Sequence, residues 1–243
     1  MTLAKSDFTA THHAWVLIVF ASMITGMVLA GRRWPKHTRW ALIVFGFGGW
    51  ALSGVYFAAM EEVDPRWSYP IQACDLLALI APLSVLLAGR FPKALTYFGG
   101  FGLTTQAFFT PVVNTGPDTL RFWVFWVLHA EIVLAAIYIV SLERFRPTWR
   151  DLRSAVLFWF VYAVAMTAIN YQTGWYYGFL GPEIPNGAED TILKYLGPWP
   201  WRPVVMMGLA LTIFSVLYLP WVLVRILNSP EAKALVADEP SEA

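Results

Sequence analysis

The residues with the greatest chemical potential in this chain are one cysteine, Cys74, and one histidine, His129. Cys74 is the only cysteine among the 243 residues. A thiolate is a nucleophile, and an imidazole within hydrogen-bonding reach can take its proton, so this pair suits covalent catalysis. A carboxylate, either Asp75 or Glu131, is expected to orient the imidazole ring. The sequence leaves open which of the two carboxylates does so.

Other polar side chains in the apolar segments are predicted to lie near this pair. Ionisable and amide groups are costly in hydrocarbon, which makes each of them a functional candidate. We predict catalytic roles for Cys74, His129 and Asp75. The residues that we predict to bind substrate are Gln72, Gln106, Asn170 and His13.

Each candidate also has a simpler structural interpretation. A lone cysteine in an apolar helix commonly packs as a small hydrophobic residue. Histidine, glutamine and asparagine commonly join helices by hydrogen bonds inside a membrane. Asp75 is harder to explain in this way, because a carboxylate one turn inside the bilayer needs a partner or water.

The composition is that of a membrane protein. Hydrophobic residues make up 58% of the chain and charged residues 14%, which lies outside the range of soluble globular domains. The single cysteine excludes an internal disulfide. The segment before the first apolar run lacks the basic start and the cleavage site of a removable signal, so we expect that run to be a retained anchor.

Apolar stretches of about 20 residues predict an all-α fold with seven transmembrane helices. The stretches lie near residues 14–31, 40–60, 70–89, 94–112, 121–142, 154–173 and 203–224. The expected organisation is an outer N-terminal segment (1–13), a seven-helix membrane domain (14–224) and a disordered cytoplasmic tail (225–243).

The distribution of basic residues predicts the orientation. They gather after the first, third, fifth and seventh stretches, whereas the opposite connections are mainly acidic. The basic residues are Arg32, Arg33, Lys36, Arg39, Arg90, Lys93, Arg144, Arg146, Arg150, Arg153, Arg225 and Lys233. Because short basic loops remain in the cytoplasm, the N-terminus is expected outside and the C-terminus inside.

Depth along each helix determines which polar groups can meet. At about 1.5 Å per residue, Cys74 and Asp75 lie roughly 6–8 Å below the outer end of their span, and His129 lies about 12 Å below. Gln106 and Asn170 also fall in the outer half of the membrane. The connection from Gly174 to Arg202, rich in proline and glycine, is expected to be ordered and to cover a site that opens outward.

Several motifs strengthen this interpretation. They are Tyr69-Pro70-Ile71-Gln72-Ala73-Cys74-Asp75-Leu76, Gly99-Gly100-Phe101-Gly102 through Gln106 to Thr110-Pro111, His129, Arg146-Pro147-Thr148-Trp149-Arg150, and Leu196-Gly197-Pro198-Trp199-Pro200-Trp201. With these motifs the chain, from about His13 to Pro220, resembles the YwaF-type bacterial integral membrane family. These proteins are relatives of the eukaryotic transmembrane-protein-164 lipid acyltransferases.

The resemblance implies a seven-helix fold and acyl transfer between glycerophospholipids through a cysteine acyl-enzyme. In that scheme Cys74 matches the nucleophile and His129 the base. The resemblance also implies a more distant kinship with fatty-acid ester hydrolases that use a threonine and a histidine. The chain departs from the family where an Asn-Tyr pair often precedes the long outer loop, because this stretch reads Trp175-Tyr176-Tyr177-Gly178-Phe179-Leu180.

We therefore expect a lipid acyltransferase or acyl hydrolase in the bacterial plasma membrane, with phospholipids or lyso-lipids as its partners. The alternative is a small transporter or ligand-sensing protein that uses the same polar cluster as a binding site. A third possibility is a zinc lipid hydrolase that uses His12 or His13 with His129 and Asp75. The preferred interpretation requires no cofactor and no metal, and it involves no nucleic acid.

Overall fold

Each apolar stretch of the sequence forms helix in the structure, a computed structural model that describes residues 6–59, 64–66, 68–183 and 192–228. The longest helices are α1 (Ala10–Arg33), α2 (Pro35–Ala58), α6 (Leu120–Ser141), α7 (Trp149–Thr173) and α8 (Trp201–Leu227). These five are long and apolar enough to cross a membrane. The chain is therefore a multi-pass α-helical membrane protein.

The third and fourth stretches form shorter helices than the sequence predicted. Helix α3 (Ala73–Leu86) has 14 residues, which is a length of about 21 Å. The fourth stretch is divided into α4 (Arg90–Gly99), the π-helix η1 (Gly100–Thr104) and α5 (Gln106–Phe109). In place of the seven similar transmembrane helices that the sequence predicted, the structure has five long helices, the shorter helix α3, and a fourth stretch made of α4, η1 and α5.

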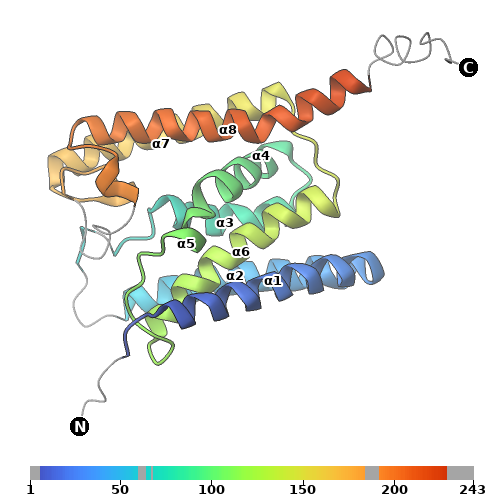
Figure 1. Cartoon of the computed structure of the whole chain (residues 1–243), viewed down its shortest axis with the longest axis horizontal. Helices are drawn as coiled ribbons and strands as arrows, with labels where there is room; N and C mark the ends of the chain where they lie inside the picture. The colour runs from blue at the N-terminus through green and yellow to red at the C-terminus, as the bar shows by residue number, and fades with distance from the viewer. Residues whose placement is uncertain (1–5, 60–63, 67, 184–191, 229–243) are drawn as a thin grey trace, which may run out of the picture.

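The helices form three layers (Figure 1). Helices α3, α4 and α6 form the middle layer, with α1 and α2 on one side and α7 and α8 on the other. The apolar window of α6 is 72% buried inside the protein, against 6% for α8. Leu77, Phe98 and Ile132 are fully buried in the middle layer. Polar residues on α3, η1 and α6 therefore lie inside the bundle.

Successive helices run in alternating directions, so the two chain ends lie at opposite ends of the bundle (Figure 1). At one end, which we call the N-terminal end, the segment before α1 pairs with the connection before α6. The N–H of Phe8 donates to the carbonyl of Asn114 (3.0 Å). The hydroxyl of Ser6 donates to the carboxylate of Asp118 (2.5 Å). The segment from Ser6 to Phe8 is thus fixed to the rest of the bundle.

The opposite end, which we call the basic end, is held together by arginine and lysine contacts. Arg90 pairs with Asp151 (2.6 Å), and Lys93 pairs with Glu143 (2.7 Å). The guanidinium of Arg225 donates to the carbonyl of Pro147. The basic residues that the sequence grouped on one side of the membrane therefore come together at one end of the structure.

The helix limits at the two chain ends differ from those predicted. Helix α1 begins at Ala10 because the Thr9 hydroxyl accepts a hydrogen bond from the N–H of His12 (3.3 Å), which caps the helix. The predicted N-terminal segment 1–13 therefore gives way to helix at residue 10. Helix α8 continues to Leu227, past the predicted start of the tail at residue 225. The rest of that tail, 229–243, lies outside the described residues.

Glycines on α2 allow α3 and α6 to approach closely. A Cβ atom on Gly46 would lie 2.8 Å from Oε2 of Glu131 and 2.9 Å from Cβ of Pro82, whereas a Cβ on Gly48 would meet nothing within 4 Å. Gly46→Ala is therefore expected to lower the free energy of unfolding by about 1–3 kcal/mol. Gly48→Ala, the matched control, should be neutral or slightly stabilising because alanine favours helix. Thermal unfolding in one detergent measures both, and equal melting temperatures would contradict the close packing.

Candidate functional site

Cys74 is half-buried in the first turn of α3 and faces η1. Its thiol lies against the hydroxyl of Thr104 without the geometry of a formed hydrogen bond. The Thr104 hydroxyl is buried and has no hydrogen-bond partner among the described residues. A buried hydroxyl without a partner can bind a water molecule or a polar group of a ligand.

The π-helix η1 holds Thr104 in this position. Its glycines lie close to neighbouring helices: a Cβ on Gly100 would lie 3.0 Å from Cβ of Ala136, and one on Gly102 would lie 2.8 Å from the Phe214 ring. Short π-helical segments are rare and often occur at functional sites. The local geometry beside Cys74 is thus unusual, and it depends on glycine.

His129 lies on the side of α6 that faces η1. Ile132 and Ala136 follow His129 by three and seven residues and so share its face, and both lie against Gly100. Helix α6 and η1 run in opposite directions (Figure 1). His129 and Thr104 therefore both lie about one helical turn from this contact, toward the N-terminal end.

The imidazole of His129 is oriented by a carbonyl group. Its Nδ1 bonds the carbonyl oxygen of Phe125 (2.6 Å), and the two rings lie 4.3 Å apart. A carbonyl oxygen only accepts, so Nδ1 carries the proton and Nε2 of the neutral ring is left as an acceptor. Within the described parts of the chain no hydrogen bond joins His129 to Cys74. The direct contact between them stays a prediction.

The two carboxylates that the sequence offered as partners of His129, Asp75 and Glu131, do not bond its imidazole in the described structure. The buried Asp75 accepts a hydrogen bond from the N–H of Gln72 (3.1 Å) and so caps α3. Glu131 follows His129 by two residues and therefore points from a different side of α6. Its carboxylate packs against Gly46 of α2, and its Oε1 has no partner in the described structure. Neither carboxylate is bonded to the imidazole in the described regions, where Phe125 takes the orienting role.

Tyr162 of α7 belongs to this site, although the sequence analysis did not identify it. Its hydroxyl donates to the carbonyl of Ile71 (2.9 Å) and lies within electrostatic range of Cys74 and Asp75. The only signal in the sequence was a polar aromatic residue inside an apolar stretch. Thr104 was also missed, since threonine is common in membrane helices and its neighbours there are glycines.

The connection between α7 and α8 covers the first turn of α3. The N–H of Gly178 donates to Oε1 of Gln72 (2.7 Å). The buried amide of Asn170 donates to the carbonyl of Tyr177 (2.8 Å) and accepts from its N–H (3.1 Å). Gln72 and Asn170 thus position this connection, including the short helix η2 (Tyr177–Phe179), and their predicted role in substrate binding stays a prediction.

Arg202 at the start of α8 secures the same connection. Its guanidinium is buried and donates to three carbonyl groups, which belong to Phe179, Gly181 and Glu183. The connection is therefore ordered over residues 174–183, as the sequence predicted, and its role as the cover of a substrate site stays a prediction. Helix η3 (Ile192–Tyr195) lies farther along, and residues 184–191 fall outside the described chain.

Tyr177 provides a test of this cover. Its hydroxyl donates to the carbonyl of Pro65 (2.7 Å) and accepts from the N–H of Tyr69 (2.8 Å). Burial raises the pKa of Tyr177 from its usual value of 10 to about 12. A phenolate cannot donate to Pro65. The stabilisation from Tyr177 is therefore fully present below pH 10, and it is lost as the pH rises through about 12.

Alkaline titration of tyrosinate absorbance measures this pKa directly. We expect the difference between the wild-type protein and Tyr177→Phe to titrate near pH 12. A tyrosine hydroxyl in water titrates at the usual value of about 10. Titration of Tyr177 at that same value would show that the cover leaves its hydroxyl in water.

The remaining predicted residues lie nearby at the N-terminal end. Gln106 is half-buried at the start of α5. The Nε2 of His13 donates to the carbonyl of Phe108 (2.8 Å), and its ring stacks on Trp126 at 6.0 Å. His12 is occupied in capping α1.

Among the residues described, no three histidine, cysteine or carboxylate side chains lie together as a metal site requires, so the zinc alternative has no ligand set there.

Comparison with known families agrees with the helical membrane fold. The model of the TMEM164 family matches residues 8–218, a region that contains every site residue named above. The chain belongs to the TMEM164 family. The match runs from the segment before α1 to residue 218 of α8, so the TMEM164 pattern covers all of the bundle except the last turns of α8. No curated protein and no solved structure matches this chain.

The site of this TMEM164 protein therefore combines a single thiol, an unpaired hydroxyl and an imidazole with a free acceptor nitrogen. They come from α3, η1 and α6, and Tyr162 adds a hydroxyl from α7. The arrangement can hold a polar group of a ligand beside a thiol, among apolar helices.

Proposed function

We propose that this TMEM164 protein transfers or hydrolyses lipid acyl groups through a cysteine acyl-enzyme. The observation that carries the proposal is the Cys74 thiol against the unpaired Thr104 hydroxyl of a π-helix. A buried donor without a partner suits an oxyanion that is present only during reaction.

The reaction follows from these groups. The sulfur of Cys74 attacks the carbonyl carbon of a phospholipid ester, and Nε2 of His129 takes the thiol proton. The tetrahedral intermediate then collapses, the carbon–oxygen bond breaks, and His129 returns the proton to the departing lyso-lipid oxygen. A lyso-lipid hydroxyl or water then attacks the thioester carbon and gives its proton to His129. The carbon–sulfur bond breaks, the acyl group leaves as an ester or a fatty acid, and His129 returns the proton to the sulfur. The imidazole and thiol approach each other when substrate is bound, because catalytic hydrogen bonds tighten in the complex.

The proposal includes seven membrane passes with the N-terminus outside, in a bacterial plasma membrane as in the YwaF-type grouping. The alternating helix directions and the gathering of arginine and lysine at the basic end support this topology. In this orientation Cys74 and His129 lie in the outer half of the membrane. The substrates are then phospholipids and lyso-lipids of the outer leaflet.

A trapped acyl-enzyme tests the proposal. Purified protein is incubated with phospholipid that carries a labelled acyl chain, quenched in acid and analysed by peptide mass spectrometry. We expect the mass of the acyl chain on the peptide that contains Cys74, and its release by neutral hydroxylamine, which cleaves thioesters. Lipid turnover without any adduct, in a protein that is unaffected by alkylation of Cys74, would refute the mechanism.

A pair of threonines offers a matched test of the oxyanion role. Thr104 and Thr96 are both completely buried with unpaired hydroxyls in the described structure, but only Thr104 lies against Cys74. Thr104→Val is expected to lower kcat about 100-fold, the cost of removing one oxyanion donor. Thr96→Val should leave kcat within about twofold. Equal effects of the two substitutions would assign the Thr104 hydroxyl to packing.

A further inference from the structure

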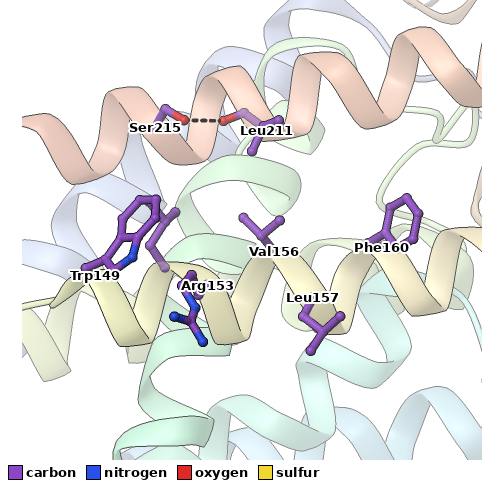
Figure 2. A pocket seen from close by; sticks show the side chains of 8 residues that line it. Trp149, Arg153, Val156, Leu157, Phe160, Leu211 and Ser215 are labelled. Atoms are coloured by element: carbon purple, nitrogen blue, oxygen red, sulfur yellow. Dashed lines mark hydrogen bonds between the residues drawn. The ribbon is translucent and has the colours of Figure 1, made fainter.

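A groove between α7 and α8 lies in the half of the bundle nearer the basic end, away from Cys74. Its volume is about 410 Å³, within the range of pockets that hold small ligands. Figure 2 shows Trp149, Val156 and Phe160 pointing from α7 toward α8. Leu211 and Ser215 of α8 form the opposite wall. The groove is open to the outside of the helix bundle, where Leu157 and Phe160 are exposed.

The walls of this groove are apolar in effect. The hydroxyl of Ser215 donates to the carbonyl of Leu211 (2.8 Å) within α8, so it offers no free donor (Figure 2). Leu157, Phe160 and Leu211 are each at least half exposed. A hydrocarbon chain fits this apolar part of the groove, and among the described residues the only charged side chain that lines the groove is Arg153.

Two arginines stand at the basic end of the same helix face. Arg150, Arg153, Leu157 and Phe160 follow one another at spacings of three, four and three residues, so they form one stripe along α7. Arg153 lines the groove, and Arg150 is exposed one turn before it. Neither guanidinium has a hydrogen bond or ion pair with a residue in the described ranges, whereas Arg90 and Arg225 at this end are engaged.

The stripe has the length of one membrane leaflet. From Arg150 to Phe160 the helix rises about 15 Å, which is half of a hydrocarbon core about 30 Å thick. The two arginines at the membrane surface match the negative phosphate of a phospholipid, and the apolar side chains below them match its acyl chain. Basic sites between membrane helices are known to hold anionic headgroups.

We propose that this groove binds one anionic phospholipid, with its phosphate on Arg150 and Arg153 and an acyl chain along Leu157, Phe160 and Leu211. This site lies apart from Cys74 and does not depend on the proposed reaction. The lipid is a bound structural or regulatory molecule that joins α8, the helix least buried by the rest of the protein, to α7.

Native mass spectrometry of the full-length protein tests this proposal by titration with dioleoyl phosphatidylglycerol or dioleoyl phosphatidylcholine. We expect one phosphatidylglycerol to bind at least about tenfold more tightly than phosphatidylcholine. Arg150→Gln/Arg153→Gln should weaken phosphatidylglycerol binding about 30-fold, from about fivefold for each basic residue near an anionic headgroup. Arg150→Lys/Arg153→Lys should restore most of the affinity. Leu211→Trp, which fills the groove, should weaken binding of both lipids.

The matched control removes two charges from the other side of the bundle. Arg32→Gln/Arg33→Gln lies on α1 at the basic end, in the layer opposite α7 and α8 (Figure 1). Phosphatidylglycerol binding should be unchanged in this variant. Equal losses of phosphatidylglycerol binding in the two glutamine variants would overturn the proposal, because binding would then depend only on the overall charge. Equal affinity of the wild-type protein for the two lipids would also overturn it, because the site would then not prefer an anionic headgroup.

Discussion

Cys74→Ala is expected to abolish lipid acyl transfer, with a loss of at least about 1,000-fold in kcat/KM. The chain has no second cysteine that can replace the thiol. Removal of a covalent nucleophile typically leaves only the rate contributed by binding and oxyanion stabilisation. Turnover of labelled phospholipid in liposomes, followed by chromatography of the lyso-lipid and transfer products, measures the loss.

The double variant Cys74→Ala/His129→Ala separates catalysis from folding. Because a nucleophile and its base act as one unit, the double variant should be no slower than either single variant. Thr96→Val is the control: it removes a buried hydroxyl that does not lie against the thiol and should retain most of the activity. Independent, multiplying losses at Cys74 and His129, each with a lowered melting temperature, would indicate two structural residues and no shared chemistry.

Arg202→Leu is expected to open the cover over the site and to lower the free energy of unfolding by about 3–5 kcal/mol. Arg202 is 2% exposed and donates to three carbonyl groups of the connection between α7 and α8. Hydrogen bonds from a charged donor contribute about 1.5–3 kcal/mol each, and the substitution also removes the cost of burying the charge, which offsets part of this loss. Thermal unfolding in detergent measures the change in stability.

The effect on the cover can be measured at Cys74 itself. The rate of maleimide labelling should rise severalfold in Arg202→Leu, because the connection that bonds Gln72 beside the thiol is released. Arg225→Leu is the matched control, since it removes an arginine from the same helix that bonds a carbonyl at the basic end. That variant should leave the labelling rate unchanged. Identical rates in Arg202→Leu and the wild-type protein would show that the connection does not control access to Cys74.

The fold class and most helix positions follow from the sequence because hydrocarbon imposes a simple requirement. A segment inside the membrane has to be apolar and has to satisfy its own backbone hydrogen bonds, so length and hydropathy locate the helices. Thr9 and Thr148 cap α1 and α7 through bonds to residues three positions later, and such local contacts can be anticipated from sequence. The broken fourth stretch could not be anticipated, because the π-helix depends on how Gly100 and Gly102 pack against α6 and α8.

Some residues of the candidate site could likewise be predicted from the sequence, and others could not. The sequence identified Cys74, Asp75 and His129, because ionisable and nucleophilic groups stand out against an apolar background. It did not identify Thr104 or Tyr162, which are ordinary residues in a membrane helix and gain significance only from their distance to the thiol. It also assigned the orientation of His129 to a carboxylate, whereas the structure provides the carbonyl of Phe125, one turn earlier on the same helix.

The sequence by itself determined that this protein is a helical membrane protein with one thiol and one deeply placed imidazole. Only the tertiary structure decided what surrounds them. Asn170 and Gln72 hold the cover over α3, and Glu131 faces the glycines of α2. The physical reason is that hydropathy and capping act over a few neighbouring residues. The partner of a polar side chain is set by which helix faces meet, and residues far apart in the chain decide that together.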